Sequence, residues 1–111
     1  MPDAIKPRPS VYTAAQQLTQ DLKSYANDPS KKGKVDAGIN GPGGLEDQIA
    51  QDGLLTGEQK KALLEAADKL ESDLKSGADA SELENELQAL VEQYARDVAT
   101  ERERQARPAS A

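Results

Sequence analysis

The residue types that most often carry out catalysis or hold metal ions are largely missing from this sequence of 111 residues, which contains no His and no Cys. Without His, the chain lacks the commonest general base and the commonest zinc ligand. The remaining carboxylates, lysines and tyrosines would need buried, perturbed surroundings to catalyse a reaction. Because nearly all of them fall on helix faces that we expect to be solvent-exposed, the sequence predicts no enzyme, no cofactor and no metal site.

The segment from Asp47 to Gln59 has a superficial likeness to a calcium-binding loop, because Asp52 and Gly53 precede a helix. With Gly53 at loop position six, positions one, three and twelve are occupied by Gln48, Ala50 and Gln59. The acids that such a loop needs, including its bidentate glutamate, are therefore missing. Helix capping and a turn explain these residues better.

Glycines at 41, 43 and 44, with lysines upstream, raise the question of a phosphate-binding loop. Such a loop needs Lys followed by Ser or Thr directly after the glycines, at the start of a helix. Here the next residues are Leu45, Glu46 and Asp47, and the two carboxylates would repel a phosphate. The pattern favours a flexible loop.

The net charge of −6 is concentrated in the C-terminal half, where residues 45–80 hold nine acids and four bases and residues 81–100 hold five acids and one base. Nucleic-acid binding needs a basic surface, which this distribution does not provide. A membrane span needs an apolar run of roughly 20 residues, which is also absent. We therefore expect neither nucleic acid nor membrane as a partner. Acidic helix faces are usually only solvated surface, and otherwise they recognise a basic partner.

Three long helices are predicted from apolar residues that recur at spacings of three and four. The first covers 11–26, behind the N-cap Ser10, and has the stripe Val11, Ala15, Leu18, Leu22 and Tyr25. The second covers 57–76, between a capping box of Thr56 and Gln59 and the stop signal Gly77. The third covers 81–104, with the stripe Leu83, Leu87, Leu90, Val91, Tyr94 and Val98.

The rest of the chain has weaker signals. A short helix is expected near 45–52, where Leu45 and Ile49 lie one turn apart. Residues 27–44 combine Gly, Pro and Lys with few apolar residues, which predicts a flexible loop that is either a linker or functional. Prolines predict a disordered arm over 1–10, and a disordered tail is expected over 108–111. Residues 11–107 then form a single helical domain.

These elements predict an all-α fold, a small antiparallel three-helix bundle. The short connection after Gly77 forces the last two long helices into a hairpin, and the first helix can reach it across the long loop. The core is expected to be thin, because hydrophobic residues make up 36% of the sequence and Phe and Trp are absent. A thin core of this size gains stability from a bound partner.

By elimination, the sequence favours a non-enzymatic helical protein–protein interaction module, of the kind found in bacterial accessory, chaperone, regulatory or signal-less secreted factors. Two alternatives stay open: a self-assembling structural helical protein, and an acidic charge-mimic inhibitor of a basic partner. The residues expected at uncovered edges of the apolar stripes, and hence to bind a partner, are Leu64, Val91, Tyr94 and Val98.

The first ten residues lack the apolar core of a secretory signal. We therefore expect a cytoplasmic protein, or one secreted by a bacterial route that does not need a signal peptide.

Overall fold

The computed structural model describes residues 10–106, and this part of the chain is helical, without a strand. The arm predicted for 1–10, apart from Ser10, and the tail predicted for 108–111 lie outside the described residues. None of the described helices is both long and apolar enough to cross a membrane. The elements are α1 (Val11–Asn27), the short 3-10 helix η1 (Pro29–Lys31), α2 (Lys32–Asn40), α3 (Leu45–Gln51), α4 (Gly57–Ser76) and α5 (Ala80–Ala106).

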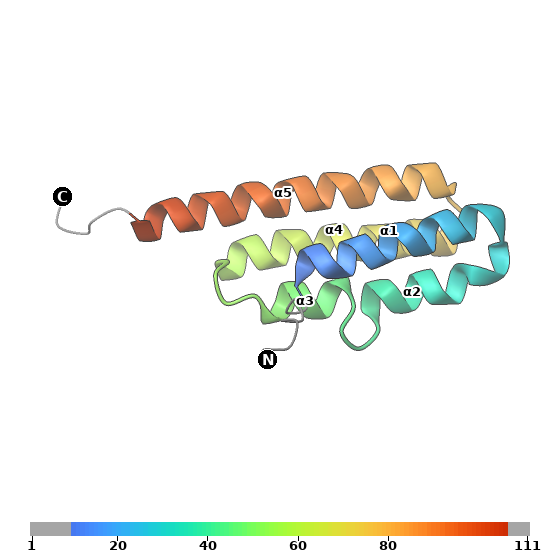
Figure 1. Ribbon diagram of the computed structural model, residues 1–111, viewed down its shortest axis with the longest axis horizontal. Coiled ribbons are helices and arrows are strands. Elements are labelled where there is room, and N and C mark those ends of the chain that lie inside the picture. Colours follow the sequence, from blue (N-terminus) through green and yellow to red (C-terminus); the bar gives the residue numbers. More distant parts are fainter. Residues whose placement is uncertain (1–9, 107–111) are drawn as a thin grey trace, which may run out of the picture.

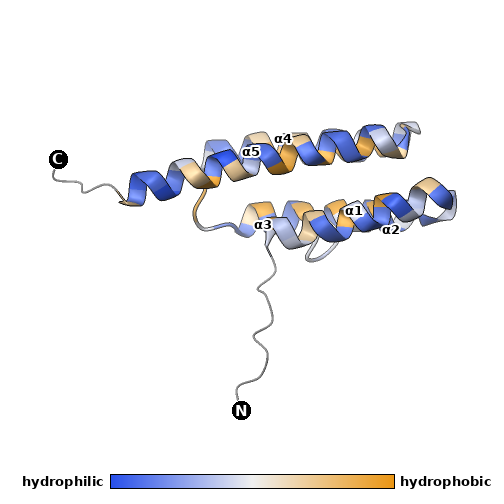
Figure 2. Ribbon diagram, turned by 45° about the horizontal axis from the view of Figure 1, so that its top comes forward, coloured by the Kyte–Doolittle hydropathy of each residue, from blue (hydrophilic) through white to orange (hydrophobic). Residues whose placement is uncertain are grey.

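The helices form a bundle with four positions, one of which is shared by α2 and α3 (Figure 1). α5 packs against α1 and α4, while α2 and α3 pack against the same two helices. Within the described residues, α1 and α4 make no close backbone contact, so they lie diagonally across the bundle. Figure 2 shows the resulting two layers, one of α4 and α5 and the other of α1, α2 and α3. The chain direction alternates from each position to the next.

The predicted all-helical bundle is confirmed. Helices α1, α4 and α5 correspond to the three long helices predicted over 11–26, 57–76 and 81–104, and α3 corresponds to the short helix near 45–52. The predicted three-helix bundle lacks the fourth position, which α2 and α3 together occupy on the side of the bundle opposite α5.

The flexible loop predicted for 27–44 is wrong for most of that segment, which contains η1 and α2. Val35 and Ile39, one helical turn apart, are both 0% exposed and join the core. The Asp28 side chain caps η1 by accepting hydrogen bonds from the backbone N–H of Ser30 at 3.1 Å and from its hydroxyl at 2.7 Å. Burial of Val35 and Ile39 offsets the conformational entropy that this Gly- and Lys-rich segment loses when it becomes helical.

The turn between α2 and α3 depends on close backbone packing at Gly44. A Cβ there would lie 2.8 Å from the carbonyl oxygen of Gly38 and 2.9 Å from that of Gly41, closer than real Cβ atoms come. The Gly44 N–H also donates to the Gly41 carbonyl at 2.9 Å. The glycines that predicted a linker therefore let α2 and α3 meet nearly end to end.

Local capping explains why α4 begins and ends where the sequence predicts. The Thr56 hydroxyl accepts a hydrogen bond from the Gln59 N–H at 3.1 Å, and the Gln59 side chain accepts one from the Thr56 N–H at 2.9 Å. At the other end, Gly77 has a φ of 90°, the left-handed conformation that glycine adopts without steric cost. These two ends fix α4 against α5 as a hairpin.

The core is one continuous cluster of buried hydrophobic side chains. All five α-helices contribute to it, and Tyr94 is the aromatic residue among its buried members. As the sequence predicts, Leu, Val, Ile and Ala fill the remainder. The members that anchor the layer of α1, α2 and α3 are Val11, Ala15, Leu18, Leu22, Val35, Ile39, Leu45 and Ile49.

Candidate functional site

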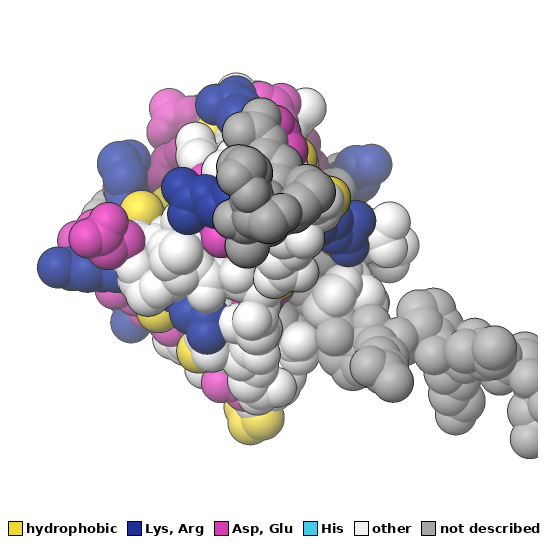
Figure 3. Space-filling view, turned by 90° about the vertical axis from the view of Figure 1, so that its left-hand side faces the viewer, with side chains coloured by type: hydrophobic (Ala, Val, Ile, Leu, Met, Phe, Trp, Pro, Cys, Tyr) yellow, Lys and Arg dark blue, Asp and Glu magenta, His cyan; other side chains and the backbone are white. Residues whose placement is uncertain are grey.

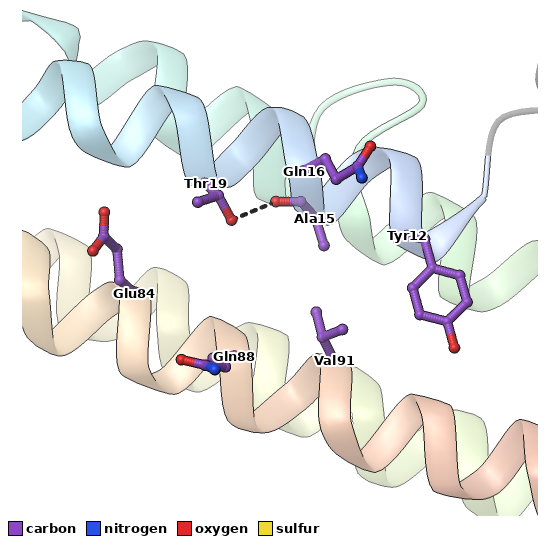
Figure 4. A pocket seen from close by; sticks show the side chains of 7 residues that line it. All are labelled: Tyr12, Ala15, Gln16, Thr19, Glu84, Gln88 and Val91. Carbon is purple, nitrogen blue, oxygen red and sulfur yellow. Dashed lines mark hydrogen bonds between the residues drawn. The ribbon is translucent and has the colours of Figure 1, made fainter.

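An open groove of about 360 Å³ runs between α1 and α5 (Figure 4). In the middle of its α1 side stands Ala15, whose single methyl group leaves space between the two helices. Ala15 and Val91 point toward one another in the middle of the groove, with Tyr12 at one end and Glu84 at the other. The complete lining is Tyr12, Ala15, Gln16, Thr19, Glu84, Gln88 and Val91.

The groove combines an apolar floor with polar rims. Ala15 is buried, and Val91 is half-buried against the core. The Thr19 hydroxyl donates to the Ala15 carbonyl at 2.8 Å, which satisfies it within α1. The hydroxyl can therefore only accept a hydrogen bond from a partner, whereas the exposed amides of Gln16 and Gln88 can both donate and accept.

Tyr12 marks the end of the groove and is 43% exposed, an unusual state for a large hydrophobic side chain in the described part of the chain. Its ring contacts the ring of Tyr94 edge-to-face, with centroids 5.0 Å apart and an interplanar angle of 74°. Aromatic ring pairs favour this edge-to-face geometry. The contact holds Tyr12 beside the groove, where its side chain stays exposed to solvent.

The four residues predicted to bind a partner do not form one surface. Val91 lines the groove. Leu64 is half-buried on α4, one turn before Asp68 and on the same helix face, which is the side toward α3. The expectation that Tyr94 and Val98 are uncovered is wrong, because they are only 6% and 7% exposed.

Tyr94 is instead part of the link between α5 and the loop before α4. Its hydroxyl donates to Asp52 Oδ2 at 2.7 Å, and Asp52 Oδ1 accepts from the N–H groups of Leu54 and Leu55. Burial alone would raise the pKa of Asp52, but these hydrogen bonds hold it below its ordinary value. Burial and the Asp52 carboxylate raise the pKa of Tyr94. The sequence analysis missed this role because the contact joins residues 42 positions apart.

A second groove of about 270 Å³ lies between α4 and α5. Lys69 on one rim and Glu86 on the other approach to 3.5 Å and form an ion pair across it. A ligand entering here would have to displace that pair, so this groove is the weaker candidate.

The end of the bundle toward which α5 runs offers no comparable surface among the described residues. Figure 3 shows this end, where basic and acidic side chains are mixed and hydrophobic ones appear as small separate spots. On the same stretch of α5, Glu101 is buried, accepts a hydrogen bond from the Gln59 side chain at 3.0 Å and pairs with Arg104 at 3.3 Å. The hydrogen bond with Gln59 ties α5 to the start of α4.

A cluster of carboxylates lies where α2, α3 and α4 meet, and the sequence analysis did not find it. Oxygen atoms of Glu46, Asp68 and Glu71 lie within 4.8 Å of one another, and Asp36 is close enough to Glu71 to share a hydrogen bond. Three carboxylates at this spacing are a ligand set that a hard divalent cation prefers. Glu46, Asp68 and Glu71 had been assigned to solvent-exposed helix faces, because the packing of α2 and α3 against α4 was not predicted.

Burial and the crowding of like charge together determine the electrostatics of this cluster. Burial raises the pKa of Glu46 to about 7, with a further contribution from the facing Asp68. Glu46 also lies in the first turn of α3, where the helix dipole favours the ionised form by about 0.3–1 kcal/mol, or less than about one pKa unit. Burial and the neighbouring acids outweigh that effect. A hydrogen bond with Asp36, followed by burial, raises the pKa of Glu71.

No family model, curated protein or solved structure matches this chain.

Proposed function

We propose that this protein is a non-enzymatic helical interaction module, and that the groove between α1 and α5 receives an apolar side chain from a basic segment of another protein. The observation that supports this most strongly is the groove itself, with its apolar floor, hydrogen-bonding rims and solvent-facing tyrosine.

The size of the groove supports a side-chain anchor. Its volume of about 360 Å³ lies at the lower end of the roughly 300–1,000 Å³ of pockets that bury a drug-sized ligand. Protein interfaces draw much of their affinity from a few side chains that fill pockets of this kind, surrounded by residues that exclude water. Tyr12 supplies the aromatic contact surface that such interfaces favour.

Charge supports a basic partner. Glu84 lines the groove, and the whole chain has a net charge of −6. A positively charged segment would be attracted to this surface and oriented on it, whereas a second acidic copy of the same chain would be repelled. The self-assembling alternative is therefore disfavoured. The charge-mimic alternative needs no apolar groove, and its binding would collapse with added salt.

Photocrosslinking from the groove tests this proposal. A benzophenone amino acid is placed at Gln88, which lines the groove, and in a second sample at Asn85, an exposed α5 residue outside the lining of both grooves. Crosslinked peptides from native lysate are then identified by mass spectrometry. We expect position 88, and not position 85, to capture a segment with an apolar residue flanked by Lys or Arg.

Two outcomes would contradict the proposal. One is equal capture from both positions, or none from position 88. The other is capture of a second copy of this chain, which would favour the self-assembling alternative. Sedimentation at several concentrations provides the matching check, since we expect the free protein to stay monomeric.

A further inference from the structure

We infer that the carboxylates of Asp36, Glu46, Asp68 and Glu71 form a proton-dependent clasp, which holds α2 and α3 against α4 at acidic pH and loosens them as the pH rises past neutrality. This inference is independent of the proposed groove function.

The placement of the four acids is what makes a clasp. Asp36 comes from α2, Glu46 from α3, and both Asp68 and Glu71 from α4. Their carboxylates meet across the boundaries between these helices. Apart from the repulsion between Asp68 and Glu71 within α4, a change in repulsion among them therefore acts between helices.

Few positive charges balance the cluster. Lys75 on α4 approaches Glu71 at 3.8 Å, but its side chain is largely exposed, and such surface pairs contribute little. Lys32 on α2 lines a small pocket together with Asp36 and Lys75. From α1, which packs on the other side of α2 and α3, the buried Asp21 is already engaged by Gln17 and by Lys34 at 3.7 Å. Asn40 donates a hydrogen bond to Glu71 without supplying charge.

Two oxygens in the cluster lack a hydrogen-bond donor. Asp36 Oδ1 and Glu46 Oε2 are fully buried and have no partner within the described residues. A buried carboxylate oxygen without a donor is costly. A proton shared between Glu46 and Asp68, and another between Asp36 and Glu71, would supply the missing donor and remove one negative charge from each pair.

The direction of the pH effect follows from the raised pKa of Glu46, which is 4.5 ordinarily and about 7 in the folded protein. The folded state favours the protonated form of Glu46, so the contribution of Glu46 to the stability of the fold is fully present below about pH 4.5. That contribution is lost as the pH rises through about 7. Above this pH the carboxylates repel one another across the helix boundaries.

The effect is expected to stay local. The apolar contacts of Val35 and Ile39 on α2, and of Leu45 and Ile49 on α3, do not depend on pH and keep these helices attached to the core. The layer of α4 and α5 has no part in the clasp beyond Asp68 and Glu71. We therefore expect faster local opening of α2 at high pH, with α5 unaffected.

Carbon-detected NMR of the Glu46 carboxyl group in the full chain gives the first test, because it needs no mutation. We expect a titration midpoint well above 6. A midpoint near the ordinary value of 4.5 would overturn the inference.

Amide hydrogen exchange between pH 5 and 8, corrected for intrinsic exchange rates, gives the second test. Protection of the Val35 and Ile39 amides is expected to fall at least tenfold as the pH rises, which is the factor that corresponds to one pKa unit. Protection of Leu87 and Leu90 on α5 is expected to stay constant. In Glu46→Gln, whose amide can donate to Asp68 at any pH, the fall should become smaller, because only the pair of Asp36 and Glu71 still loses a proton. Glu65→Gln, which removes one charge from an exposed position on α4, should retain it. An unchanged pH dependence in Glu46→Gln would contradict the clasp.

Discussion

Replacing Ile39 by Ala is expected to lower the free energy of unfolding by about 2–5 kcal/mol, the cost of truncating a fully buried aliphatic side chain. Ile39 is 0% exposed and belongs to the continuous core, although it lies in a segment rich in Gly and Lys. Small domains have a total stability of only about 5–15 kcal/mol, so this loss would be a large part of the whole. It can be measured by urea denaturation followed by circular dichroism.

A graded control separates packing from helix propensity. Ile39→Val removes one methylene group and should cost about 0.5–1.5 kcal/mol. If α2 were a flexible linker, both variants would be as stable as the wild type. Equal midpoints for Ile39→Ala and the unmodified protein would therefore contradict the four-position bundle.

Replacing Tyr94 by Ala is expected to cost about 3–5 kcal/mol, the usual range for a buried aromatic ring. Its ring is buried and contacts Tyr12, and its hydroxyl donates to the Asp52 carboxylate at 2.7 Å. Tyr94→Phe keeps the ring and removes only that hydrogen bond. Since hydrogen bonds to charged groups contribute about 1.5–3 kcal/mol, the Phe variant should lose roughly that amount or less, because the Leu54 and Leu55 amides still satisfy Asp52 in part.

Tyr12→Ala is the matched control for the same ring pair. Because Tyr12 is 43% exposed, its removal should cost mainly the edge-to-face contact, about 0.5–1.5 kcal/mol. Denaturant midpoints that decrease in the order wild type, Tyr12→Ala, Tyr94→Ala would confirm that Tyr94 is structural. Full stability of Tyr94→Ala would contradict this role and restore the original prediction of a surface residue.

The three long helices could be predicted from the sequence because their signals are local. The Thr56 capping box, the Gly77 stop and the stripes spaced by three and four residues depend on neighbours within two turns. The observed bounds of α4, Gly57–Ser76, are those that these signals predict.

Helix α2 could not be predicted in this way, because only tertiary packing offsets its poor composition. Val35 and Ile39 are too few to make a periodic stripe, and the need for glycine at Gly44 arises from the backbone of α2 that it approaches. In the sequence, a glycine that permits close packing looks the same as one that permits flexibility.

The candidate sites depended on the same missing information. Val91 was predicted at the edge of its stripe and does line the groove, but the α1 residues on the other side of the groove become relevant only once α1 and α5 are paired. The carboxylate cluster was missed because Asp36 and Glu46 meet Asp68 and Glu71 only once α2 and α3 are packed against α4, which no local pattern shows.

The central claim is that the groove between α1 and α5 binds a segment of another protein. Its most direct test uses the segment captured from position 88, prepared as a synthetic peptide. The affinity of this peptide is measured by calorimetric titration into the wild type, Gln88→Trp and Asn85→Trp. We predict that Gln88→Trp, which fills the groove, binds at least about tenfold more weakly, a loss of about 1.4 kcal/mol, and that Asn85→Trp binds as the wild type does. Equal affinity of all three proteins would contradict the claim.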